Sequence, residues 1–62
     1  MAKITIEITT DNQAFEDGNY SYEVARILKN AAKRIETRDE LEISFKLLDS
    51  NGNVVGWCQN EL

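Results

Sequence analysis

The residues best suited to ligand chemistry are basic side chains gathered in one predicted helix. Residues 24–35 contain four basic side chains and no acidic one. The four are Arg26, Lys29, Lys33 and Arg34. Spacings of three and four place the first three on one side of the helix. Such groups recognise phosphates, and an oligomer could bring several basic faces around one ligand, together with aromatic side chains such as Tyr20 or Tyr22.

This pattern predicts an anion site, for example for a nucleotide, made by Arg26, Lys29, Lys33 and Tyr22. The competing interpretation is a solvated helix face whose charges pair with acids of neighbouring segments. Charged stripes on amphipathic helices usually have no further role than this.

Most other site chemistry is excluded by the residues that the sequence lacks. It contains no histidine, which removes the commonest general base and metal ligand. The single cysteine, Cys58, cannot form an intrachain disulfide or a Cys-rich zinc site, and we expect it to be a packed apolar residue. Neither residues 11–23 nor residues 49–53 have the spacing of a calcium loop. We therefore expect no enzyme, no catalytic residue, no metal site and no cofactor.

The chain is acidic as a whole, with seven basic and eleven acidic side chains and a net charge of -4. This balance and the presence of one predicted helix argue against direct sequence-specific DNA binding. An acidic surface can instead imitate nucleic acid. The candidate acids are Asp11, Glu16, Asp17, Asp39, Glu40 and Glu42. The alternative is that these acids only keep the surface soluble.

Hydrophobic periodicity places these residues on one helix and three strands. Two segments alternate between apolar and polar residues, and between them apolar residues recur three and four apart. The expected elements are a strand over residues 2–10, a helix over 21–37, and strands over 41–49 and 53–60. We expect residues 1–62 to form a single α+β domain in the order β-α-β-β. One amphipathic helix would cover one face of a three-stranded sheet and leave the other face open for oligomerisation.

Strand order and hairpin register are open in the sequence. The last strand is the most continuously apolar, which favours a central position between the other two, against direct parallel pairing of the first two strands. A two-residue turn would pair Leu47 with Gly56. A three-residue loop with Gly52 in the left-handed region would pair Leu47 with Val55 and Phe45 with Trp57. We favour the second register because it collects the large residues beneath the helix.

Whichever register is adopted, apolar side chains remain on the face away from the helix. They are Leu48 and Val54 in one register, and Leu48, Val55 and Trp57 in the other. This open face predicts an interface made by these four residues and a homo-oligomer. The alternative is a monomer whose outer face is polar enough to remain in water.

Several segments resemble a group of very short phage and prophage proteins. They are Thr9-Thr10-Asp11-Asn12 with Ala14-Phe15, Val24-Ala25-Arg26-Ile27-Leu28 with Ala32 and Arg34-Ile35-Glu36, and Asp49 with Asn51-Gly52-Asn53 and Val55-Gly56. The resemblance touches most of the chain in the same β-α-β-β order. It implies a small phage accessory protein that acts by binding, and it carries no functional residue over.

These observations lead to one principal expectation. The chain is expected to be a non-enzymatic inhibitor that binds a host or defence protein stoichiometrically, through its sheet face or its acidic surface. The alternative is an oligomer that sequesters an anionic nucleotide signal through the basic helix residues, and a third interpretation is an accessory protein without a ligand. No apolar run suits a signal peptide or a membrane span, so we expect no membrane contact and a location in the host cytoplasm.

Overall fold

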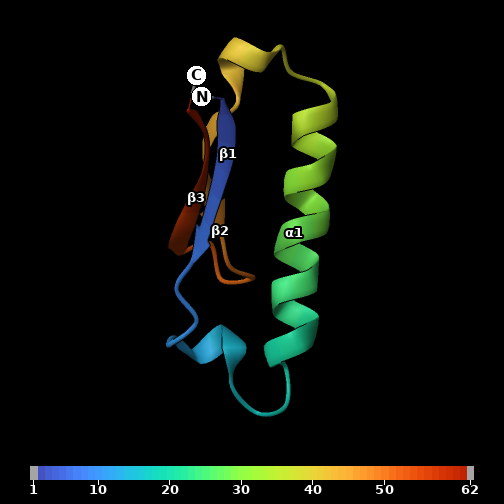
Figure 1. The fold of residues 1–62 in the computed structure, drawn as a ribbon. Helices are drawn as coiled ribbons and strands as arrows, with labels where there is room; N and C mark the ends of the chain where they lie inside the picture. Colours follow the sequence, from blue (N-terminus) through green and yellow to red (C-terminus); the bar gives the residue numbers. More distant parts are fainter. Residues whose placement is uncertain (1, 62) are drawn as a thin grey trace.

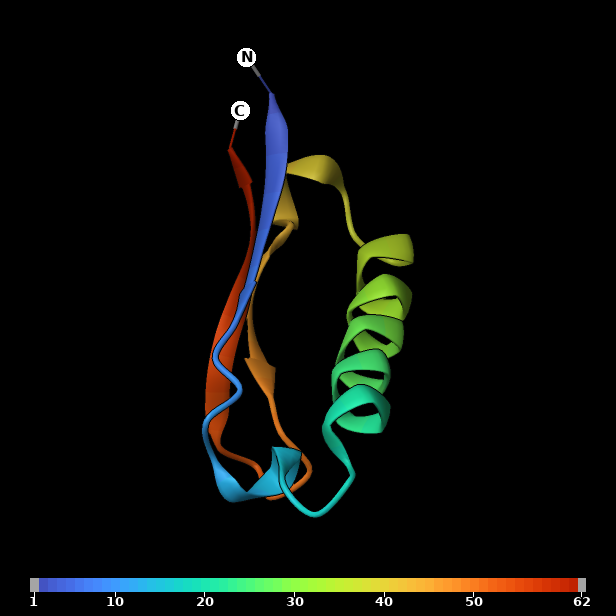
Figure 2. The same cartoon turned by 60° about the horizontal axis from the view of Figure 1, so that its bottom comes forward.

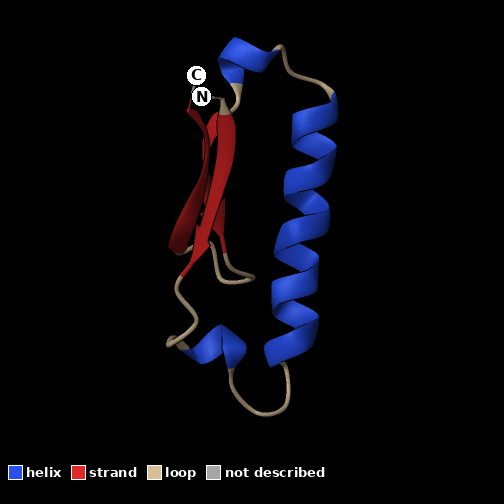
Figure 3. Cartoon of the chain, in the orientation of Figure 1, coloured by secondary structure: helices blue, strands red, loops and turns tan. Residues whose placement is uncertain are grey.

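The computed structural model describes residues 2–61 and shows a layer of strands with one long helix against it (Figure 1). The elements are β1 (Lys3–Ile8), the 3-10 helix η1 (Gln13–Phe15), α1 (Tyr20–Glu36), the 3-10 helix η2 (Glu40–Glu42), β2 (Ser44–Leu48) and β3 (Val54–Glu61). The predicted α+β fold in the order β-α-β-β is confirmed, with two short 3-10 helices in the connections (Figure 3).

β3 lies at the centre of the sheet. The strand order is β1-β3-β2, and β3 is antiparallel to both neighbours. This confirms the preferred strand order. A consequence is that β1 and β2 are both edge strands, each with one side turned away from β3.

The predicted elements and the observed ones differ mainly at the start of β2. Leu41 belongs to η2 instead of a strand, and it is 78% exposed. The predicted strand over 41–49 is therefore too long, because pairing with β3 starts near Ile43, whose carbonyl accepts from Asn60 N–H at 2.8 Å. The first strand likewise ends at Ile8, before the predicted residue 10, and the helix and β3 differ from their predicted bounds by one residue at each end.

The turn between β2 and β3 is the predicted three-residue loop. Asp49 N–H donates to the Asn53 carbonyl at 2.9 Å, which leaves residues 50–52 as the loop. Gly52 has a φ of +83°, in the left-handed region that glycine adopts without strain. Gly52 N–H also donates to the Asp49 carbonyl at 3.1 Å, closing the turn.

Beyond the loop, however, the preferred hairpin register is wrong. Leu48 pairs with Val54, but Leu47 pairs with Gly56, so Val55 is an extra residue on β3. This β-bulge shifts the register by one position. The rest of the hairpin therefore follows the pairing that the two-residue turn would have produced.

The bulge exchanges the faces of the following side chains, because successive side chains of a strand point to opposite faces. Phe45 pairs with Cys58 and not, as predicted, with Trp57. Cys58 is fully buried, whereas Trp57 lies on the other face and is 47% exposed. Val55, an interface candidate only in the register of the two-residue turn, lies on the helix side as the preferred register placed it and is buried in the core.

α1 packs against β2 and η1, on one side of the sheet (Figure 2). The buried apolar residues beneath it are Phe15, Ile27, Ala31, Ile43, Phe45, Leu47, Val55 and Cys58. A helix about 10 Å wide covers roughly two strands spaced about 4.8 Å apart. β1 therefore extends past the cover: Ile4 and Ile6 are 47% and 42% exposed, although the partner of Ile6 on β3 is the buried Cys58.

Replacing Gly56 with Ala should destabilise the sheet strongly. A Cβ at this position would lie 1.7 Å from the carbonyl oxygen of Glu7, so β1 would have to move away from β3. We expect the free energy of unfolding to fall by about 2–4 kcal/mol. Gly18→Ala is the matched control: a Cβ there meets nothing within 4 Å, so only its φ of +80° is penalised, by about 1 kcal/mol. Urea denaturation followed by circular dichroism measures both, and equal losses would contradict the close approach of β1 and β3.

Candidate functional site

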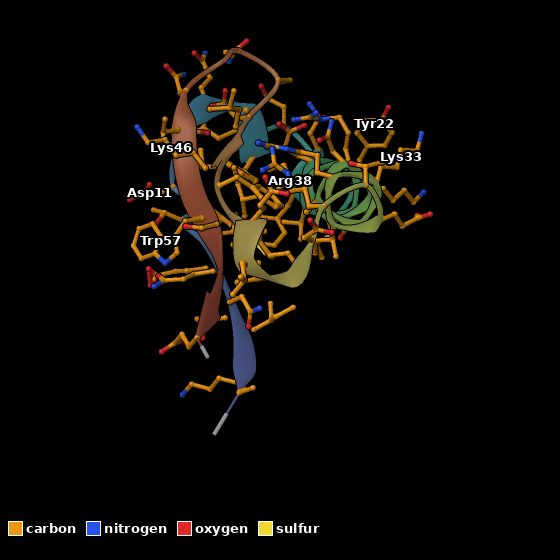
Figure 4. All side chains as sticks on the ribbon, turned by 90° about the horizontal axis from the view of Figure 1, so that it is seen from above. Asp11, Tyr22, Lys33, Arg38, Lys46 and Trp57 are labelled. Atoms are coloured by element: carbon orange, nitrogen blue, oxygen red, sulfur yellow. The ribbon has the colours of Figure 1, made fainter. Side chains whose placement is uncertain are left out.

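The outer face of the sheet, turned away from α1, presents Trp57 at its centre. Trp57 pairs with Glu7 on β1 and with Lys46 on β2, so these three residues form one row across the sheet. Figure 4 shows Trp57 and Lys46 on the side of the sheet opposite to the helix. An exposed indole between an acid and a base offers a rigid apolar surface with charged neighbours.

Two more apolar side chains extend this surface toward the hairpin loop. Leu48 follows Lys46 by two positions on β2 and therefore shares its face, and Leu48 pairs with Val54. Both side chains are exposed. We call Leu48, Val54 and Trp57 the outer patch. They are three of the four predicted interface residues; the fourth, Val55, is buried.

Sequence reasoning missed the charged neighbours of the outer patch. The alternation of β1 and β2 marks Glu7 and Lys46 as outward-facing residues. Lys46 lies beside Trp57 because of the bulge in the β2–β3 pairing, whereas Glu7 lies on the other side because of the register of β1 with β3. The sequence pattern specifies neither.

Arg26, the arginine of the predicted anion site, is held by contacts within the protein. Its Nε and Nη2 donate to the two carboxylate oxygens of Glu23, each at 3.1 Å. Nη2 also donates to the Leu48 carbonyl at 3.2 Å. Glu23 is only 3% exposed and also accepts from the Ser50 N–H at 2.7 Å. The guanidinium thus joins the helix to the hairpin, and a phosphate would have to compete with a bidentate ion pair for it.

The remaining candidates of the anion site lie together on the far side of α1. Tyr22, Lys29 and Lys33 are all exposed, and Figure 4 shows Tyr22 and Lys33 on the side of the helix away from the sheet. A hollow of about 230 Å³ lies between α1 and β2, next to Arg26 and Arg34. Arg34 Nη1 donates to the Lys46 carbonyl at 3.0 Å. An anion approaching the helix would therefore meet two flexible ammonium groups and two arginines already bonded to the protein.

Asp49, at the start of the hairpin loop, accepts hydrogen bonds from the loop and from the segment before α1. Its Oδ1 accepts from the backbone N–H groups of Asn51 and Asn53 at 2.9 and 2.8 Å, and its Oδ2 accepts from Asn12 Nδ2 at 2.7 Å. Asn12 in turn caps η1 through its Oδ1, which accepts from the Ala14 N–H. One buried carboxylate therefore ties the hairpin loop to the segment before α1.

Both buried carboxylates favour their ionised forms. The hydrogen bond from Arg26 lowers the pKa of Glu23 and outweighs the effect of burial, with a further contribution from the Ser50 N–H. For Asp49, burial raises the pKa, but the hydrogen bonds from Asn53, Asn51 and Asn12 together outweigh it, and the net pKa lies below its usual value.

The acids proposed as a nucleic-acid mimic do not form one surface. Asp11, Glu16 and Asp17 lie around η1, whereas Asp39 and Glu42 lie around η2 (Figure 1). These two segments are at opposite ends of a molecule 38 Å long. The side chain of Glu40, the sixth of these acids, lies outside the described part of the structure.

Cys58 is a core residue. Burial raises the pKa of its thiol, and the positive charge of Arg34 offsets this only in part. Burial thus favours the protonated thiol over the thiolate, which is the nucleophilic form. Within residues 2–61, no group of three or more histidine, cysteine or acidic side chains is arranged to hold a metal ion.

In comparisons with known proteins, no family model, no curated sequence and no solved structure matches this chain. Among the residues described, no helix has the length and apolar character required to cross a membrane.

The structural role of Arg26 predicts that two basic residues of α1, Arg26 and Lys33, contribute differently to stability. Arg26→Ala should lower the free energy of unfolding by about 2 kcal/mol, because it leaves the buried Glu23 carboxylate without its counter-charge; the partly exposed guanidinium keeps the loss below that of a fully buried pair. Lys33→Ala, on the exposed side of the same helix, should change it by less than about 0.5 kcal/mol. Urea denaturation of both variants gives the comparison, and a similar small loss for Arg26→Ala would contradict the anchoring role.

The lowered pKa values of Glu23 and Asp49 predict sensitivity to acid. A depressed pKa in the folded state contributes stability above the unfolded value, about 4, and this stability is lost as pH falls through the lower folded value. We expect the free energy of unfolding to fall steadily below about pH 4.5. A double variant, Glu23→Gln with Asp49→Asn, should show a shallower dependence. Its control, Glu16→Gln with Asp39→Asn, removes the same charge from exposed positions and should retain the original slope in denaturation measured from pH 7 to pH 3.

Proposed function

We propose that this chain is a non-enzymatic binding protein that attaches to a target protein through the outer patch. The observation that carries this proposal is the exposure of Trp57 on the central strand. Tryptophan, with tyrosine and arginine, is enriched among the residues that contribute most of the binding energy at protein interfaces. Because β3 is paired on both sides, its backbone is already ordered. Trp57 would therefore lose little conformational entropy on binding.

The surroundings of Trp57 support an interface. Leu48 and Val54 add exposed apolar area, and Glu7 and Lys46 supply polar groups beside it. Protein interfaces combine an apolar centre with a polar rim in this way. The net charge of -4 favours approach to a target with a basic surface.

The target class that we propose is a host or defence protein, blocked by stoichiometric association in the host cytoplasm. This part of the proposal rests on the resemblance to small phage proteins. A binding mode without catalysis also suits a sequence without histidine, in which the single cysteine is buried.

The alternative, sequestration of an anionic nucleotide, is the weaker proposal. It is favoured by the exposure of Lys29, Lys33 and Tyr22 on one helix face. It is disfavoured because the guanidinium of Arg26, the group best suited to bind a phosphate, already forms an ion pair with Glu23. Native mass spectrometry of the protein purified from a phage-infected lysate separates the two: an added mass of nucleotide size supports sequestration, and a complex with one protein supports the outer patch.

The role of the outer patch predicts that Trp57→Ala strongly weakens target binding while the fold is retained. The target is first identified by native mass spectrometry and then purified. Because the chain contains a single tryptophan, 5-fluorotryptophan labels this site alone. We expect its ¹⁹F resonance to shift when the purified target is added, and Trp57→Ala to weaken binding by at least 100-fold, the loss typical of a central interface residue.

The matched control is Leu41→Ala, which removes an exposed apolar side chain from η2, away from the sheet face. It should leave the affinity unchanged. Tight binding by Trp57→Ala, or an unchanged ¹⁹F resonance in the complex, would place the binding surface elsewhere.

A further inference from the structure

The two edge strands of the sheet, β1 and β2, differ in whether side chains of α1 cover their backbone groups. Side chains from α1 cover the β2 edge: Arg26 Nη2 donates to the Leu48 carbonyl at 3.2 Å, and Arg34 Nη1 donates to the Lys46 carbonyl at 3.0 Å. Arg34 also lies over the ring of Phe45, 4.0 Å from its centre. The β2 edge is thus protected against pairing with another strand.

The β1 edge has no such cover. Within residues 2–61, β1 has no neighbouring strand on the side away from β3. Thr9 N–H donates to the Val55 carbonyl at 2.7 Å, so odd-numbered residues direct their backbone groups toward β3. In an antiparallel pair the intervening residues direct theirs the other way. The N–H and C=O groups of Ile4 and Ile6 therefore point outward from the sheet edge.

Apolar side chains accompany this edge. Ile4 and Ile6 face the helix side of the sheet but are not covered, because α1 packs over β2. On α1, Leu28 is 41% exposed. At 100° of rotation per residue, it lies on the flank opposite to Arg26 and Arg34, which is the flank toward β1. An open strand edge next to exposed isoleucines is a surface suited to adding another strand.

We propose that β1 pairs with β1 of a second copy, antiparallel and about a two-fold axis at Thr5. In this register Thr5 faces Thr5 of the second copy, and Ile4 faces Ile6. Lys3 faces Glu7, and by symmetry Glu7 faces Lys3. Lys3 and Glu7 lie at equal distances on either side of Thr5, so antiparallel pairing about Thr5 places opposite charges across from each other. Opposite charges directly across a strand pair are stabilising. The register also joins even-numbered residues to one another, so that the outward N–H and C=O groups of Ile4 and Ile6 bond to those of the second copy.

The resulting dimer has one continuous six-stranded sheet. A two-fold axis perpendicular to the sheet keeps both helices on one face and both outer patches on the other. Strand spacing and residue rise place the two Trp57 side chains about 20 Å apart. Self-association through the edge leaves the outer patch free, so this inference does not depend on the function proposed for it.

Charge reversal tests the register. Glu7→Lys places a lysine opposite Lys3 twice in the dimer, while within its own chain the new side chain lies beside Trp57. We expect the dissociation constant of the dimer, measured by sedimentation equilibrium, to rise about tenfold. The double variant Lys3→Glu with Glu7→Lys restores both opposite pairs and should return the dissociation constant to within about threefold of the original. Lys29→Glu with Glu36→Lys, an exchange on the helix face, is the control and should have no effect.

A cysteine at the symmetry axis tests the geometry directly. Thr5 would face its own copy in a non-hydrogen-bonded pair with Cα atoms about 4.5 Å apart, within the range of a disulfide. Thr5→Cys should therefore form a disulfide-linked dimer under mild oxidation. Glu7→Cys should not, because the two Glu7 positions are four residues out of register, about 13 Å along the strands. Mass spectrometry of the peptides distinguishes this bond from one involving the buried Cys58.

Concentration-dependent dimerisation that weakens in Glu7→Lys, recovers in the double variant and gives a Thr5→Cys cross-link supports the proposal. A protein that stays monomeric at millimolar concentration overturns it. A dimer that is indifferent to the charge reversal but lost in Trp57→Ala also overturns it, and assigns self-association to the outer patch instead.

Discussion

The buried carboxylate of Glu23 joins the helix to the hairpin loop. Glu23 lies in the first turns of α1, where it accepts hydrogen bonds from Arg26 on the same helix and from the Ser50 N–H in the hairpin loop. A buried charge is tolerated only where such partners compensate its lost hydration, so the helix cannot slide along the hairpin without a large energetic penalty. Asp49 adds a second attachment, through Asn12, for the segment that leads into the helix. Together these contacts attach the first turn of α1 and the segment before it to the hairpin loop.

The position of the helix determines which surfaces stay open. From its place over β2, α1 reaches the outer edge of that strand with Arg26 and Arg34 and satisfies backbone carbonyls there. A single helix is too narrow to reach β1 as well, so Ile4 and Ile6 remain half-exposed beside an unpaired edge. The whole outer face, with Trp57 at its centre, is also uncovered. The contact that stabilises the small core thus leaves one edge and one face available.

The two interactions that we propose would use different groups of the protein. The outer patch offers side chains, and selectivity there would come from the shape around Trp57 and the charges of Glu7 and Lys46. The β1 edge offers backbone groups, and selectivity would come from strand direction and the opposed charges of Lys3 and Glu7. Because Glu7 borders both surfaces, a change at this residue acts on both, whereas Thr5 at the proposed symmetry axis and Leu48 in the outer patch separate them. A dimer formed through the edge would present two outer patches on one side and bind an extended or dimeric target more tightly than one patch could.

Local sequence determined the elements and their order. Isoleucine alternation, the helical stripe and the apolar last strand each carry a signal within a few residues, and the central position of β3 followed from its composition. The loop at Gly52 was likewise predictable, since only a few turn types suit its residues. The bulge was not, because the extra residue at Val55 interrupts the pairing of β2 with β3 and leaves no periodic signal in either strand. That one shift moved Trp57 to the outer face and Cys58 into the core. The engagement of Arg26 also needed the tertiary structure: its spacing from Glu23 is visible in the sequence, but the burial that turns this spacing into an anchor exists only once the hairpin loop is folded against the helix.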